Sequence, residues 1–226
     1  MTTRSVVSAP RADDGFTLTE VLITTLLMGI VTIILLTTMT SLTTLAARTE
    51  ARSTTLSSTR TALERVSRDL RAANPVDPLP TGVATEKYDN SITFKVYCAS
   101  GPGCTSNLRA VTYAYDATTA QLTATTGGTT TVLQGPEGTS TLQIGLRRGA
   151  VLNTASQPVF RYYGRNGAQI ATSPSPLAGQ PPSYFRDCTK QVEIHLIVRS
   201  EANKPDQTTD LSTTVTLRNH NEVNPC

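Results

Sequence analysis

Residues Gly15–Glu20 read GFTLTE, and Val21–Leu36 continue with VLITTLLMGIVTIILL, a run that contains no charge and no proline. Glu20 is the only charged residue between Phe16 and Leu45. As a helix, Leu18–Met39 would be roughly 33 Å long at 1.5 Å per residue, enough to cross the hydrocarbon core of a bilayer. The threonines are compatible with that setting, because their hydroxyls can bond carbonyls of the preceding turn. The stretch therefore predicts a membrane-compatible helix that opens, unexpectedly, with a carboxylate.

The helical pattern continues beyond the apolar run. Neither Gly nor Pro occurs between Met39 and Ala73, and Asn74-Pro75 then ends the pattern, because proline disfavours a helical residue before it. The apolar residues of the second half recur at intervals of three, four and seven or their sums, as an amphipathic helix requires: Leu42, Leu45, Leu56, Leu63, Val66 and Leu70. We predict one continuous helix from about Thr17 to Ala73.

Arginines crowd the second half of this helix: Arg48, Arg52, Arg60, Arg65, Arg68 and Arg71, interleaved with Glu50, Glu64 and Asp69. We interpret them as a solvated face with some i,i+4 pairing, such as Glu64 with Arg68. A nucleic-acid surface would also need stacking aromatics, and this segment has none. The net charge of +3 is too small to imply a polyanionic partner.

Beyond Pro75 the apolar period changes to two, which is typical of half-buried strands. Ile92, Phe94, Val96 and Cys98 alternate with polar neighbours, as do Val111, Tyr113 and Tyr115. Further strands are expected at Gln121–Thr125, Thr130–Leu133, Thr141–Leu146, Val159–Tyr163, Gln191–Arg199 and Leu211–Leu217. The Pro-rich segment ATSPSPLAGQPPS after Ile170 is expected to be a surface loop.

The expected fold class is therefore α+β. A long N-terminal helix, transmembrane in its first half and amphipathic in its second, would pack on an antiparallel β-sheet domain. We expect four segments along the chain: a leader at 1–15, a membrane helix at 16–46, its amphipathic half at 47–74, and an extracytoplasmic β-rich domain at 75–226.

Four cysteines bear on the compartment of that domain: Cys98, Cys104, Cys188 and Cys226. Their spacing does not fit a zinc site. An even number in a tethered β-rich domain favours disulfides and an oxidising compartment. Cys98 and Cys104 could close a small loop, leaving Cys188 to pair with Cys226, but the other two pairings and four buried free thiols remain open.

No catalytic constellation stands out in the sequence, so we expect a protein that is not an enzyme and has no cofactor. His195 alternates with Val192, Ile194, Leu196 and Val198 and is interpreted as a solvated strand residue, and His220 lies in a polar tail. The carboxylates lack the spacing of a calcium loop, so whether the chain binds a metal stays unknown.

The N-terminal segment has three interpretations. It could be a secretory signal cut near Ala46 and Ala47, although its apolar run is longer than such signals use. It could be an ordinary membrane anchor in which Thr17 and Glu20 form a capping box and Glu20 favours the helix dipole. The third interpretation rests on a resemblance.

GFTLTE followed by an apolar helix resembles the N-terminal motif of type IV pilins and type II secretion pseudopilins. The resemblance implies that a prepilin peptidase cuts between Gly15 and Phe16 and that Phe16 is then N-methylated. Glu20 would neutralise the N-terminal amine of a neighbouring subunit and so set the register of assembly, because an unpaired carboxylate is costly in an apolar filament core. The partners implied are the peptidase, other pilin or pseudopilin subunits and the cytoplasmic membrane, with a single span and the C-terminal domain outside.

Three shorter stretches are similar to J-type pseudopilins and related minor pilins: Leu63–Asn74, Phe160–Ile170 and Thr213–Asn219. This resemblance implies a structural minor subunit of a secretion or pilus-like filament. The alternatives are a single-pass anchored binding domain that never polymerises, and a competence pilin. Only a competence pilin would have nucleic acid as a partner.

Overall fold

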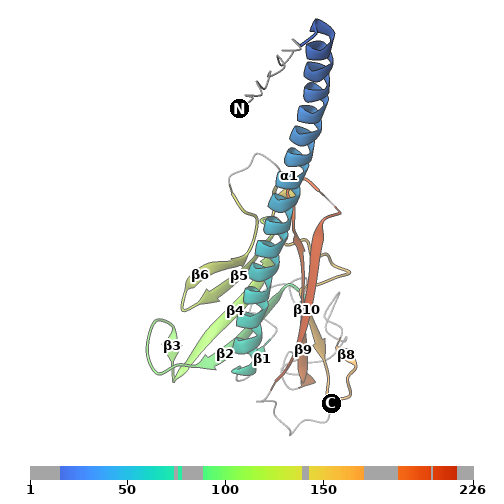
Figure 1. The fold of residues 1–226 in the computed structure, drawn as a ribbon. Coiled ribbons are helices and arrows are strands. Elements are labelled where there is room, and N and C mark those ends of the chain that lie inside the picture. The colour runs from blue at the N-terminus through green and yellow to red at the C-terminus, as the bar shows by residue number, and fades with distance from the viewer. Residues whose placement is uncertain are drawn as a thin grey trace, which may run out of the picture. The chain divides into compact units, whose positions relative to one another are not determined.

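A computed structural model of the chain describes residues 16–73, 76–77, 89–138, 143–170, 188–204 and 206–217. The chain divides into two compact units, Met1–Ala47 and Arg48–Cys226. A single 54-residue helix, α1 (Leu18–Arg71), contributes to both units (Figure 1).

The helix forms because nearly all of its residues are compatible with helical backbone. Gly29 is its only glycine and it contains no proline. It ends where Ala72 N–H bonds the carbonyls of Arg68 and Asp69 and Ala73 N–H bonds that of Leu70, two residues short of the predicted end. The continuous helix predicted from the sequence is therefore confirmed.

The buried stripe of α1 begins later than the sequence predicts. Leu42 and Leu45 are 61% and 59% exposed, and Leu56 is half-buried. The stripe that is buried consists of Thr55, Thr59, Ala62, Leu63, Val66, Ser67 and Leu70. Thr55 and Thr59 are tolerated inside because their hydroxyls bond the carbonyls of Ala51 and Thr55 at 2.9 and 2.7 Å. The spacing of apolar residues along a helix does not indicate which part of the apolar stripe packs against a sheet.

Two antiparallel sheets complete the second unit. The first has the strand order β1-β2-β4-β5-β6, with β3 also pairing β4, and the second has the order β10-β9-β7-β8. The strands of the first sheet are β1 (Val76–Asp77), β2 (Ser91–Tyr97), β3 (Cys104–Thr105), β4 (Leu108–Asp116), β5 (Gln121–Thr126) and β6 (Thr129–Gln134). Those of the second are β7 (Phe160–Tyr163), β8 (Gln169–Ile170), β9 (Gln191–Arg199) and β10 (Thr208–Thr216).

One hydrophobic cluster joins α1 to both sheets, so the architecture is α+β, as predicted. Its largest fully buried side chains include Tyr113, Tyr162, Phe94, Phe160 and Ile194. They come from strands whose apolar residues alternate with polar ones, as a sheet with one buried face requires.

A polar contact adds to this packing. The Tyr113 hydroxyl donates to Asp69 Oδ2 at 2.6 Å, which connects β4 to α1 inside the second unit. Burial, and then the bond to Asp69, raise the pKa of the Tyr113 phenol, so it remains a donor at physiological pH. Gln134 makes a second connection, with Oε1 accepting from the Ser58 hydroxyl at 3.0 Å and Nε2 donating to the Gly149 carbonyl at 2.9 Å.

The strand predicted at Thr141–Leu146 is wrong where the structure describes it. Ile144–Leu146 form a short 3₁₀ helix (η2), and Thr141 and Leu142 lie outside the described residues. Gly145 weakens a strand at this point. Its carbonyl accepts instead from Nε of the buried Arg199 at 2.5 Å, an interaction that the local alternation does not reveal.

The interpretation of His195 as solvated is also wrong, because the residue is only 8% exposed. Its Nε2 lies 2.5 Å from Asp210 Oδ1 on β10, the strand that pairs with β9. The partner strand lies further along the chain, so alternation within β9 could not predict this contact.

Replacing Leu70 by alanine should lower the free energy of unfolding of the second unit by about 2–5 kcal/mol, because the side chain is fully buried in the shared cluster. Denaturant unfolding of the full-length protein in detergent measures the change. The matched change Glu64→Ala, at an exposed position of the same helix, should have an effect below about 0.5 kcal/mol. A Leu70→Ala effect as small as that of the control would contradict this account of the core.

Candidate functional site

The N-terminal end of α1 is the first candidate site. Phe16 and Thr17 precede the helix, and Phe16 is 80% exposed. Gly15 lies outside the described residues, so the predicted cleavage point falls at their boundary. The residue expected to become the new N-terminus is therefore largely exposed.

Thr17 caps the helix. Its hydroxyl oxygen accepts a bond from the Glu20 N–H at 3.3 Å, and its carbonyl accepts bonds from the N–H groups of Glu20 and Val21. The described residues include only this half of the predicted capping box, because no bond from Thr17 N–H to the Glu20 carboxylate is present among them. Capping therefore does not occupy the carboxylate of Glu20.

Glu20 lies in the first turn of α1 and is exposed. No hydrogen bond or ion pair joins its carboxylate to another residue in the described part of the chain. The helix dipole favours a negative charge in this turn. No described residue therefore competes for this carboxylate with a cationic group from outside the chain.

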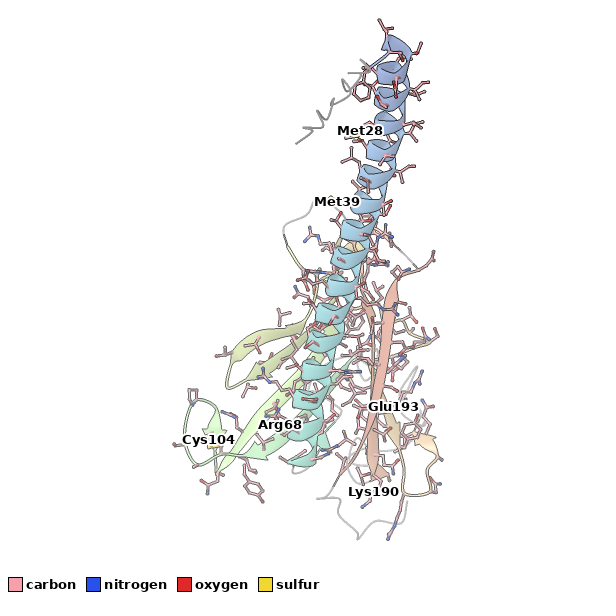
Figure 2. All side chains as sticks on the ribbon, in the orientation of Figure 1. Met28, Met39, Arg68, Cys104, Lys190 and Glu193 are labelled. Carbon is pink, nitrogen blue, oxygen red and sulfur yellow. A yellow bond between two sulfur atoms is a disulfide. The ribbon has the colours of Figure 1, made fainter. Side chains whose placement is uncertain are left out.

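The rest of the first unit is an apolar rod surface. The side chains from Phe16 to Ala47 are all exposed, including Leu18 at 82%, Met28 at 71% and Met39 at 65%, the last two labelled in Figure 2. This part of α1 is long and apolar enough to cross a membrane. An apolar surface of this extent is not stable in water, so it must be covered by lipid or by other apolar helices.

The hydroxyl groups within this surface find their partners inside the helix. Thr24, Thr32 and Thr38 donate to the carbonyls of residues three or four positions earlier at 2.7–2.9 Å. The same pattern recurs at Thr25, Thr37, Thr40, Ser41, Thr43 and Thr44. The threonines therefore add little polarity to the outer surface of the helix, as predicted.

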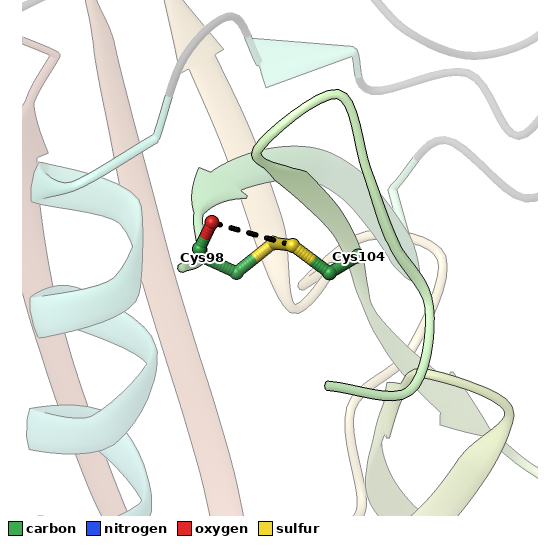
Figure 3. The surroundings of a disulfide bond; sticks show 2 residues. All are labelled: Cys98 and Cys104. Carbon is green, nitrogen blue, oxygen red and sulfur yellow. Dashed lines mark hydrogen bonds between the residues drawn. A yellow bond between two sulfur atoms is a disulfide. The ribbon is translucent and has the colours of Figure 1, made fainter. Parts of the chain in front are cut away.

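The cysteines form the next candidate site. Cys98 and Cys104 form a disulfide, with Cα atoms 6.1 Å apart, which closes the loop between β2 and β3 (Figure 3). The dashed contact in that figure joins Cys104 Sγ to the Cys98 carbonyl oxygen at 3.3 Å, and a disulfide sulfur has no proton to donate. Gly103 has φ +73° and lies against Gly127, so a side chain at either glycine would collide with backbone.

Cys188 is 1% exposed and also takes part in a disulfide bond. Cys226 lies outside the described residues. No cysteine in the described part of the chain is a free thiol. The alternative of four free thiols is therefore wrong, and disulfides of this kind persist where the surroundings are oxidising.

The remaining titratable groups in the described part of the chain do not assemble into a metal site. Among the described residues no group of three His, Cys, Asp or Glu side chains could hold an ion. His195 and Asp210 contact each other, and His195 Nδ1 is buried without a described partner. Two residues of this kind do not supply a nucleophile with an orienting group and an oxyanion site.

The arginine-rich face of α1 is arranged differently from the predicted i,i+4 pairing. No Glu64–Arg68 ion pair is present among the described residues, whereas Arg48 Nε lies 3.9 Å from Glu201. Arg60, Arg68 and Arg71 line a groove with residues of β10. Sequence analysis counted these arginines but missed the groove, because β10 follows about 140 residues later and no local pattern connects the two.

A helix with an exposed apolar first half and a second half packed on antiparallel sheets defines an α+β fold of the pilin-like class. Residues 10–36 match the family model described as the prokaryotic N-terminal methylation motif. The match supports the type IV pilin-like family. No curated protein sequence matches the chain.

The disulfide can be checked by peptide mapping without reduction. Cleavage after Lys95 and Arg109 yields one peptide, Val96–Arg109, that contains both Cys98 and Cys104. We expect this peptide to be recovered without a covalent link to another peptide, because its disulfide is internal. On reduction its mass should increase by that of two hydrogen atoms. Its recovery in covalent linkage to a peptide containing Cys188 or Cys226 would contradict the pairing.

Proposed function

We propose that the chain is a structural, non-enzymatic minor subunit of a type IV pilus-like or type II secretion filament. The observation that carries the proposal is the Glu20 carboxylate, which has no partner among the described residues and lies in the first turn of a helix whose first half is exposed and apolar, within the segment that matches the methylation motif. This combination suits a helix that leaves lipid and packs against identical or related helices.

The proposed sequence of events begins in the cytoplasmic membrane. Residues 16–46 span the bilayer once, 1–15 form the leader, and 47–74 with 75–226 lie outside the cytoplasm. Prepilin peptidase cuts between Gly15 and Phe16, and Phe16 is N-methylated. Other pilin or pseudopilin subunits are then the partners in assembly.

Glu20 acts in the assembly step. In an apolar filament core its carboxylate would be stabilised by the N-terminal amine of a neighbouring subunit, and the ion pair would fix how far one helix advances along the next. The exposed position of Glu20 and the absence of a partner for it in the described part of the chain support this role. We place the chain with subunits similar to J-type pseudopilins on the three stretches that resemble them, two of which are β7–turn–β8 and the end of α1.

N-terminal sequencing and intact mass of the membrane-extracted protein test the processing step. We expect a chain that begins with N-methylated Phe16 when a prepilin peptidase is present, and a full-length chain when Gly15 is replaced by valine. A chain that still begins at Met1 in the presence of the peptidase would favour the single-pass anchored domain. A chain that begins near Ala47 would favour a secretory signal.

Charge reversal at Glu20 tests the assembly step. Glu20→Lys should leave the protein in the membrane but reduce its recovery in sheared filaments by about 10-fold or more, because the positive charge removes the pairing and is itself costly in an apolar core. Glu50→Lys provides a matched control, since it makes the same charge change at another exposed position of α1. Normal incorporation of Glu20→Lys would refute the assembly role.

A further inference from the structure

The second unit contains a groove along the free edge of β10. Its volume is about 500 Å³, and Arg60, Glu64, Arg68 and Arg71 of α1 line it opposite Leu211 and Thr213 of β10. Arg68 is labelled in Figure 2, on the same stretch of α1 that Figure 1 draws beside β10. All of these residues belong to the Arg48–Cys226 unit, so the groove does not depend on the first unit.

One wall of this groove has unpaired backbone groups. β10 is the terminal strand of its sheet and pairs only with β9. Ser200 N–H bonds the Gln207 carbonyl, and Leu217 N–H bonds the Lys190 carbonyl. This register shows that the backbone N–H and C=O groups of the odd-numbered residues of β10 point toward β9. Because backbone direction alternates along a strand, the N–H and C=O groups of Asp210, Ser212 and Thr214 point to the free edge. No backbone bond reaches them from elsewhere in the described part of the chain.

The other wall of the groove carries excess positive charge. Arg60, Arg68 and Arg71 are exposed, and none forms an ion pair with a carboxylate of the described residues. Glu64 is the only acidic residue among the described residues that line the groove. Exposed guanidinium groups beside a strand edge favour a ligand that has both carboxylates and an extended peptide backbone.

The spacing of the arginines matches such a ligand. Arg60 and Arg68 are eight residues apart on the helix, which corresponds to about 12 Å. Residues i and i+4 of an extended strand are about 13 Å apart and lie on the same face. The residue between them, i+2, would face the apolar side chains of Leu63 and Leu211, which also line the groove.

We propose that this groove binds an extended acidic segment of a partner protein, which adds to the second sheet as a fifth strand beside β10. Carboxylates at i and i+4 pair with Arg60 and Arg68, and an apolar residue at i+2 packs on Leu63 and Leu211. The outward face of the added strand is uncharged or basic, because Asp210 is exposed on that side of β10. A nucleic acid fits less well, since it cannot pair with the strand edge and none of the described residues that line the groove is aromatic.

This proposal does not rest on filament assembly, and its test leaves the N-terminus unchanged. The probe is the fluorescein-labelled peptide Thr-Glu-Thr-Val-Thr-Glu-Thr, titrated with full-length protein in a non-ionic detergent and followed by fluorescence anisotropy. We expect saturable binding, and no binding by the same peptide with Lys in place of both Glu residues. Failure of the acidic peptide to bind better than the Lys peptide would overturn the proposal.

Protein variants locate the binding. Arg60→Glu combined with Arg68→Glu should weaken binding by about 10-fold or more, because both ion pairs become repulsive. The control is Arg165→Glu, which is exposed in the turn between β7 and β8 and does not line the groove. It should bind like the unmodified protein, and an equal loss in both variants would show that binding is not at the groove. Unchanged thermal unfolding establishes that the variants fold.

A modified peptide isolates the backbone pairing. N-methylation of alternate residues along one edge leaves every charge in place but removes the N–H donors that would pair with β10. We expect peptides methylated on one of the two edges to lose at least about 10-fold in affinity, and those methylated on the other edge to bind normally. Equal binding by both, or equal competition by a single-stranded oligonucleotide, would reduce the groove to a nonspecific anion surface and overturn the proposal.

Discussion

The packing of the Arg48–Cys226 unit depends on three side chains of α1, Leu63, Val66 and Leu70. They belong to one core cluster with the inner faces of both sheets. A sheet with one apolar face must bury that face against another layer. Here a single helical stripe does so for strands that are far apart in the sequence. The Asp69–Tyr113 hydrogen bond lies beside this stripe and adds a directional contact to packing that is otherwise nondirectional.

One continuous helix therefore combines an exposed apolar half with a half that packs on the sheets. Its first half has only exposed side chains, mostly apolar, whereas its second half alternates a buried stripe with a charged face. The change needs no break in the hydrogen-bonding pattern, since it is made by side chains alone. The same charged face then becomes one wall of the groove beside β10.

Where a segment's environment is determined locally, the sequence predicted the structure well. β9 has the predicted bounds, because Val192, Ile194, Leu196 and Val198 alternate without interruption. β1, β3 and β8 were missed because a two-residue strand depends on its partner rather than on its own composition. His195 was misjudged for a related reason, since its contact with Asp210 comes from the neighbouring strand β10.

The candidate sites also divide into those that depend on local sequence and those that depend on segments far apart in the chain. The positions of Phe16 and Glu20 at the start of an exposed apolar helix follow from sequence order alone, and the structure places them there. The Cys98–Cys104 bond was one of several pairings that the spacing allowed. The groove could not be predicted, because it depends on which edge of the second sheet lies next to α1.

The internal hydroxyl bonds of α1 have a consequence for how the helix can change its surroundings. Because Thr24, Thr32 and their counterparts already bond carbonyls of their own helix, neither lipid nor protein has to supply a partner for them. Partitioning between two apolar phases then involves no exchange of hydrogen bonds along the rod. The free energy of transferring such a segment from lipid to an apolar protein interior is therefore small. A single charged group at its end can then change which of the two environments is favoured.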